Sequence, residues 1–131
     1  MKNVLAGLSI VGLFAIVGCG GDDDKGGGTG TPEAACKSIV AELCSKFYGC
    51  LSEAELDAAR SLDLFPVGNN EADCRTKNEQ EQCTEQQLKC DSGKSYNSGK
   101  ASECLNQYKS YSCDEFTTQE DSPAACEAIC Q

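Results

Sequence analysis

The fold is decided by residues 31–51, which read TPEAACKSIVAELCSKFYGCL. Apolar residues and cysteines recur there at intervals of three and four, the spacing that places side chains on one face of a helix. Thr31 is a favourable N-cap, Pro32 suits the first helical position, and Glu33 adds an acid to the first turn. The stretch therefore predicts an amphipathic helix that starts at Thr31 and ends near Cys50.

Shorter helices are predicted along the rest of the chain by their start signals. These signals are the Ser52–Glu55 capping box, Asn70, Asn97 or Ser98, and Ser122 with Pro123. No run of alternating apolar residues is long enough to predict a strand. The expected fold class is all-α, a small disulfide-linked bundle of about four to five short helices.

Large apolar residues are too few to hold such a bundle by burial alone. Between Asn69 and Gln87 there is none, so the helix expected from Asn70 towards Gln82 has almost no apolar face. Only cysteine and alanine can point inward from it. Covalent links to other segments must therefore hold this helix in place.

Ten cysteines follow Cys19 and can supply those links. They are Cys36, Cys44, Cys50, Cys74, Cys83, Cys90, Cys104, Cys113, Cys126 and Cys130. An even number in an exported chain predicts a disulfide framework, in which each bridge contributes about 2–4 kcal/mol. The spacing leaves the pairing open. Cys126 and Cys130, one helical turn apart, are better placed to bond to other segments than to each other.

Metal and haem sites are the alternative use of so many cysteines. Zinc sites use closely spaced cysteine pairs, usually with histidine, and iron–sulfur sites use C-x₂-C runs. The chain has no histidine and no C-x₂-C, and C-x-x-C-H for haem is absent as well. We therefore expect no metal site and no cofactor.

The N-terminus predicts export and lipid attachment. Lys2 precedes an apolar stretch over residues 4–17, a pattern typical of a signal peptide. The stretch ends in Ile16-Val17-Gly18-Cys19, which resembles the lipobox of bacterial lipoproteins. The resemblance implies a lipoprotein signal peptide at 1–18, cleavage before Cys19, and a membrane anchor through acyl chains on Cys19.

A linker is expected at 19–30, followed by one cysteine-rich helical domain at 31–131. Residues 20–30 read GGDDDKGGGTG, a composition that behaves as a flexible tether. Its acids at 22–24 are either a solvated linker or a sorting cue. Gly20, rather than aspartate, follows Cys19; by resemblance to the enterobacterial sorting rule, this favours the outer membrane over the inner membrane.

Charge and composition exclude several classes of function. The chain has a net charge of −10, and nucleic acid is an improbable partner because phosphate contacts need clustered lysine and arginine. Without histidine, no Ser-His-Asp or Cys-His centre is possible, and no P-loop motif occurs. We expect no enzymatic activity. A protein or a glycan remains open as the partner.

Tyr96, Tyr108 and Tyr111 are the candidate binding surface. Tyrosine offers a large contact area at a low entropy cost, and Tyr108 and Tyr111 are three residues apart on one side of a predicted helix. The alternative is that these rings fill a core that is short of leucine and phenylalanine.

Several segments resemble the small cysteine-rich lipoproteins that myxobacteria and related bacteria carry in many copies. They are the lipobox and Gly-Asp linker, the three-cysteine helix, KASECL at 100–105, CDEF at 113–116 and PAACEAIC at 123–130. The resemblance covers most of the mature chain. It implies an envelope location and a helical disulfide fold, and it assigns no functional residue.

The sequence therefore favours a membrane-anchored envelope lipoprotein that acts as a non-enzymatic structural or binding module. An alternative is an inhibitor or ligand domain that presents a rigid disulfide-framed loop, with residues 91–97 as the candidate loop. A thiol-redox protein is a third reading, although redox centres usually contain C-x-x-C.

Overall fold

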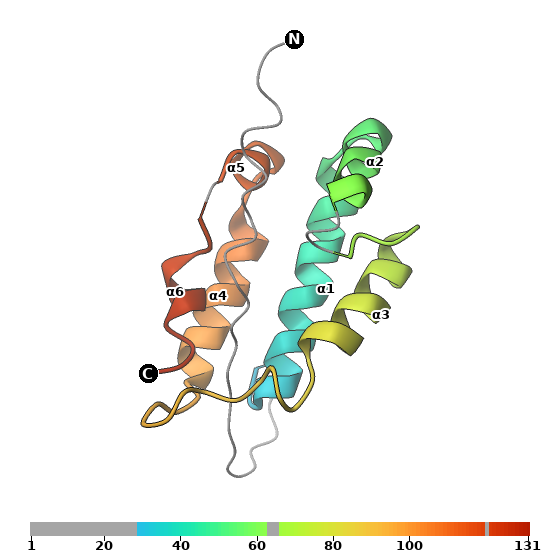
Figure 1. Cartoon of the computed structure of the whole chain (residues 1–131). Helices are drawn as coiled ribbons and strands as arrows, with labels where there is room; N and C mark the ends of the chain where they lie inside the picture. The colour runs from blue at the N-terminus through green and yellow to red at the C-terminus, as the bar shows by residue number, and fades with distance from the viewer. Residues whose placement is uncertain (1–28, 63–65, 120) are drawn as a thin grey trace.

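A computed structural model describes residues 29–62, 66–119 and 121–131. Its central element is α1, Pro32–Cys50 (Figure 1). The Thr31 hydroxyl accepts a hydrogen bond from the backbone N–H of Ala34, and Pro32 occupies the first turn, as the sequence predicts. The helix ends where the backbone N–H of Leu51 donates to the carbonyl of Phe47.

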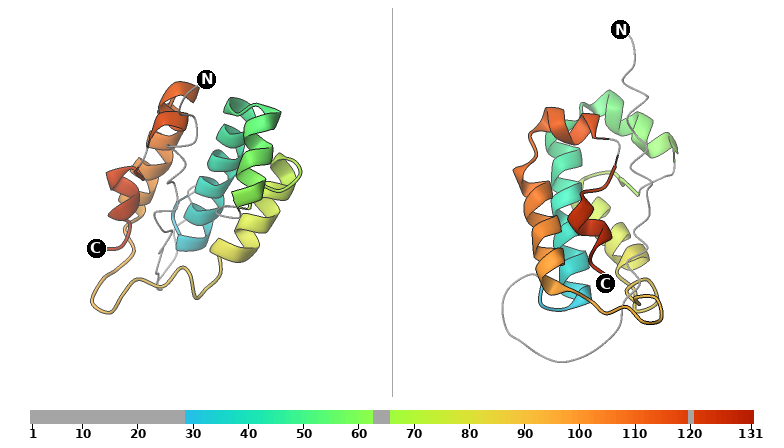
Figure 2. Two further views of the ribbon diagram at one scale, coloured as in Figure 1. Left: turned by 45° about the horizontal axis from the view of Figure 1, so that its top comes forward. Right: turned by 90° about the vertical axis from the view of Figure 1, so that its left-hand side faces the viewer.

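Five further helices lie in the described part of the chain. They are α2 Glu53–Leu62, α3 Glu71–Gln82, α4 Ser98–Ser110, α5 Cys113–Thr118 and α6 Ala124–Glu127. Helix α1 packs against α3, α4 and α5, and α6 packs against α4. Figures 1 and 2 show that α1 and α4 begin at the same end of the bundle. We call this end, with segment 83–97, the loop end, and the opposite end, with α2 and α5, the α2–α5 end.

The buried residues form two clusters on different faces of α1. The apolar core consists of Ala35, Ile39, Leu43, Phe47, Leu56, Ala59, Val67, Ala101, Cys104, Leu105, Tyr108, Phe116, Ala125 and Ile129. The cysteine core consists of Cys36, Val40, Cys44, Cys74, Cys83 and Leu88. One face of α1 is therefore covered by apolar side chains, and the other mainly by the disulfides Cys36–Cys83 and Cys44–Cys74.

The prediction of a helical, disulfide-linked fold is confirmed, with six helices in the described ranges rather than the four to five expected. The additional helix is α5, which begins with a capping box in which Ser112 and Glu115 satisfy each other's backbone N–H groups. Ser112 with Glu115 is not among the helix starts predicted from the sequence.

The predicted last helix is wrong in its bounds. It was expected to start from Ser122 with Pro123 and to carry both Cys126 and Cys130. Helix α6 instead has Pro123 as its N-cap, without a side-chain hydrogen bond, and ends at Glu127. The backbone of Cys130 pairs with that of Tyr96 in an isolated antiparallel β-bridge. This extended pairing ends the helical course of the chain before Cys130.

Candidate functional site

The five disulfides determine which segments meet at each end of the bundle. The pairs are Cys36–Cys83, Cys44–Cys74, Cys50–Cys113, Cys90–Cys130 and Cys104–Cys126. All ten cysteines proposed for the framework are used, and Cys126 and Cys130 bond to other segments, as expected. Two bridges join α1 to α3 and its end, one joins α1 to α5, and two hold the C-terminal segment.

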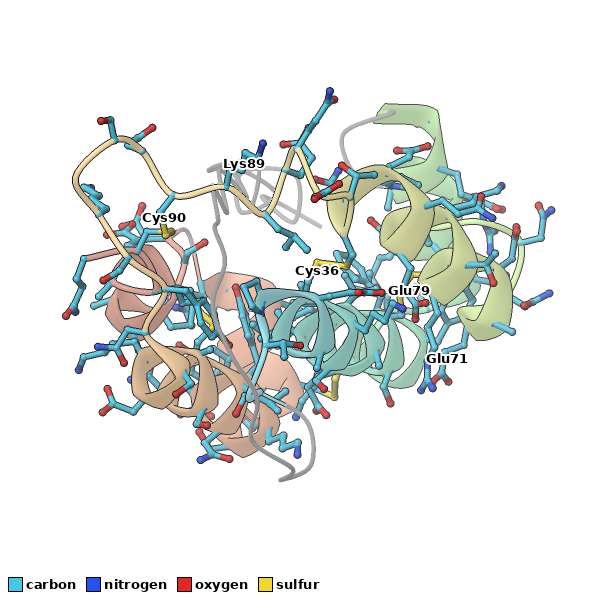
Figure 3. All side chains as sticks on the ribbon, turned by 90° about the horizontal axis from the view of Figure 1, so that it is seen from below. Cys36, Glu71, Glu79, Lys89 and Cys90 are labelled. Carbon is cyan, nitrogen blue, oxygen red and sulfur yellow. A yellow bond between two sulfur atoms is a disulfide. The ribbon has the colours of Figure 1, made fainter. Side chains whose placement is uncertain are left out.

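A groove of about 500 Å³ opens at the loop end, between the start of α1 and the segment that follows α3. It is lined by Thr31, Pro32, Glu33, Cys83, Glu85, Leu88 and Lys89. Leu88 and Cys83 are buried and supply an apolar floor. Figure 3 looks onto this end and shows Lys89 on the chain segment that runs past α1, with its side chain directed away from the helices.

Charges of both signs surround the groove. The Lys37 ammonium lies 2.6 Å from the Glu33 carboxylate, and this hydrogen bond lowers the pKa of Glu33. The charge of Glu33 is therefore paired with that of Lys37 within α1. Lys89 is exposed and forms no ion pair among the described residues. The groove can bind a ligand by contact and charge. Its lining residues contain no arrangement of a nucleophile beside a base.

The groove was not predicted from the sequence. Thr84 and Gln87 signal a turn, and the Gln87 N–H does approach the Thr84 hydroxyl, so the turn itself could be expected. Its position against the start of α1 depends on the Cys36–Cys83 bond, and cysteine spacing alone leaves that pairing open.

The candidate loop at 91–97 is an exposed turn that is held on both sides. The Lys94 N–H donates to the Asp91 carbonyl at 2.9 Å, and Gly93 has a φ of 91°, which favours glycine. Before the turn, Cys90 is bonded to Cys130. After it, Ser95 exchanges two backbone hydrogen bonds with Gln131, at 2.6 and 3.1 Å.

The three candidate tyrosines do not form one surface. Tyr96 precedes α4, whereas Tyr108 lies near its end, about 18 Å away at 1.5 Å per residue. Tyr108 is only 4 % exposed and belongs to the apolar core; burial raises its pKa. Tyr111 is partly exposed and packs edge-to-face against Tyr108, with ring centroids 6.0 Å apart. Tyr108, Tyr111 and Phe116 line a small hollow of about 10 Å³.

Tyr96 has a different role at the loop end. Its hydroxyl lies within hydrogen-bond distance of the carbonyls of Thr29 and Thr31, and the hydroxyls of Thr29 and Ser102 are also in contact. Burial raises the pKa of Tyr96 to about 12. Tyr96 therefore holds the chain that leads into α1 against the start of α4.

The signal peptide at 1–18, the acylation site Cys19 and most of the linker at 19–30 lie outside the described residues. Within the described ranges, no helix combines the length and apolar character needed to cross a bilayer. In the same ranges, no group of three or more acidic, cysteine or histidine side chains is arranged to hold a metal ion. No protein-family model, curated protein or solved structure matches this chain.

Proposed function

We propose that the chain is an exported lipoprotein, anchored through Cys19, whose helical domain is a non-enzymatic structural or binding module of the cell envelope. The cysteine pairing is the observation that carries the proposal. Ten of the eleven cysteines bond to one another, and the eleventh is Cys19, in the lipobox-like motif. Structural disulfides persist outside the reducing cytosol, which agrees with export.

Intact mass spectrometry of protein purified from bacterial membranes tests the proposal. We expect a chain that begins at Cys19, carries acyl mass, and takes up an alkylating reagent only after reduction. A Cys19→Ser variant is the matched control and should appear in the soluble fraction without acyl mass. An unacylated wild-type chain would contradict the anchor. Reactive thiols before reduction would instead favour redox or metal chemistry.

The proposal extends to the outer membrane, supported by Gly20 directly after Cys19. Expressed in an enterobacterium, the chain should fractionate with the outer membrane. A Gly20→Asp variant should shift to the inner membrane, because aspartate at this place resembles the retention signal. Equal distribution of the two proteins would contradict this part of the proposal.

A second candidate function is an inhibitor or ligand domain that presents the turn at 91–97. The observation that favours it is that the turn is exposed yet held by Cys90–Cys130 on one side and by Ser95 on the other. An inhibitor should slow a trypsin-like protease that accepts Lys94, and Lys94→Ala should abolish the effect. Rapid cleavage after Lys94 without loss of protease activity would contradict this function.

A further inference from the structure

The N-terminal segment enters the bundle at the loop end. Thr29 and Thr31 are held there by the Tyr96 hydroxyl, beside the start of α4. Thr29 is ten positions after Cys19, and ten residue steps span at most about 35 Å. If Cys19 is anchored, as proposed above, the loop end is the part of the domain tied closest to the bilayer.

Two of the three described cations without a partner lie at the same end. Among the described residues, most lysines and arginines form an ion pair or donate to a carbonyl, whereas Lys89, Lys94 and Lys109 do neither. All three are exposed. Lys89 and Lys94 flank the turn at the loop end, where Asp91 lies between them in the sequence and Glu85 lines the groove with Lys89. The two lysines therefore balance the two acids of this segment. Lys109 lies near the end of α4, away from the tether.

The α2–α5 end is more acidic. The carboxylates of Glu53 and Asp57 are 84 % and 72 % exposed and share a single cation, Arg60, at 3.9 and 2.5 Å. Asp114 is exposed at the start of α5. An anionic membrane surface attracts lysine, by roughly fivefold in binding for each residue near it, and repels such carboxylates. Charge and tether position thus favour the same orientation.

We propose that the loop end docks on anionic phospholipid headgroups through Lys89 and Lys94, so that the α2–α5 end points away from the membrane. The inference rests on the proposed anchor at Cys19. The tether keeps the two lysines at a high effective concentration near the surface, so contacts that are weak individually suffice. The Cys90–Cys130 bond and the hydrogen bonds of Ser95 with Gln131 hold the backbone on both sides of the turn, so both lysines stay at the loop end.

The test is lysine acetylation of the full mature lipoprotein in vesicles of two compositions. One set contains phosphatidylcholine alone, and the other equal parts of phosphatidylcholine and phosphatidylglycerol. A neutral acetylating reagent is added, and mass spectrometry gives the rate for each lysine as a ratio between the two sets. We expect Lys94 and Lys89 to react roughly fivefold more slowly on the anionic vesicles, with Lys109 unchanged. Added salt should remove the difference.

Two single variants provide a matched comparison. Lys94→Glu should reduce the protection of Lys89 on anionic vesicles, whereas Lys109→Glu, which changes the same charge at an exposed site at the other end, should leave it intact. Equal ratios for Lys94 and Lys109 in the wild-type protein would overturn the docking while the anchor stands. A protein that fails to sediment with vesicles of either composition would overturn the anchor and, with it, the docking.

Discussion

Helix α1 packs against α3 on one side and against α4 and α5 on the other, and the two sides are held mainly by different means. On the second side a single disulfide, Cys50–Cys113, adds to the apolar contacts. Towards α4 and α5 it presents Ile39, Leu43 and Phe47, which pack in the apolar core; Phe47 and Phe116 meet edge-to-face with centroids 5.4 Å apart. Towards α3 the contacts are two buried disulfides with Val40 and Leu88. The comparison teaches that covalent bonds can replace apolar packing within one small fold, and that each interface should fail under a different perturbation.

The largest effect is expected from removing both bridges of the cysteine core. In the quadruple variant, alanine replaces Cys36, Cys83, Cys44 and Cys74. The free energy of unfolding should fall by about 2–4 kcal/mol for each lost bridge, and α3 keeps almost no apolar face. Hydrogen exchange should show α3 amides exposed while α4 stays protected. As a control, replacing Cys104 and Cys126 by alanine should leave α4 largely protected, because apolar neighbours remain. Full protection of α3 without its bridges would refute the comparison.

Truncating the apolar core comes next. Phe47→Ala removes a ring that is 4 % exposed and should lower the free energy of unfolding by about 3–5 kcal/mol. The corresponding change on the cysteine side, Val40→Ala, removes two carbons and should cost about 2 kcal/mol. Urea unfolding of the oxidised proteins measures both. An equal loss for the two variants would mean that the two faces of α1 do not differ as described.

A smaller effect is expected at Asn78, the buried polar residue beside the cysteine core. Its side-chain amide donates to the carbonyls of Pro66 and Cys74, both at 2.8 Å. Asn78→Ala leaves the Pro66 carbonyl without this donor and should cost about 1–3 kcal/mol. Thr76→Ala, on the exposed side of α3, is the control. If both variants unfold at the same urea concentration, the amide contributes nothing to holding α3.

The smallest effect concerns acid pH at the helix starts. Hydrogen bonds from the backbone N–H groups of Ser112 and Asn69 lower the pKa values of Glu115 and Asp73 respectively. A lowered pKa stabilises the fold above the ordinary values of 4.5 and 3.8, and this contribution is lost as pH falls through the folded-state pKa. The urea concentration at the unfolding midpoint should therefore fall as the pH is lowered into the acid range. This fall should be less steep for Glu115→Gln and for Asp73→Asn than for the wild-type protein. Unchanged slopes would contradict these assignments.

Local signals accounted for most of the helices. Thr31, Asn70 and Asn97 all cap helices through their own side chains, because capping depends on residues within one turn. The weak apolar face of α3 also correctly indicated that covalent links hold it. These features need no knowledge of distant segments, and the sequence displays them directly.

Features that depend on distant partners were not accessible in the same way. The groove forms because segment 83–89 lies against the start of α1. That position follows from the Cys36–Cys83 bond, which is one of many pairings that the cysteine spacing allows. Tyr108 and Tyr111 have the same local pattern, yet Tyr108 lies in the core and Tyr111 is partly exposed. Tyr111 follows the last residue of α4 and has an extended backbone, so helical spacing no longer determines where its ring lies. The backbone of Tyr96 pairs with that of Cys130, and its hydroxyl contacts the carbonyls of Thr29 and Thr31. Both partners are distant in the sequence.

The Cys36–Cys83 bond has a mechanical consequence for a domain that is pulled from its N-terminal side. Such a pull can peel away residues 29–35, but then it reaches a covalent cross-link that must break before α1 unwinds further. Tension applied at Cys130 is likewise carried by its bond to Cys90. The helices between the bonded cysteines are thus shielded from a force that acts along the chain.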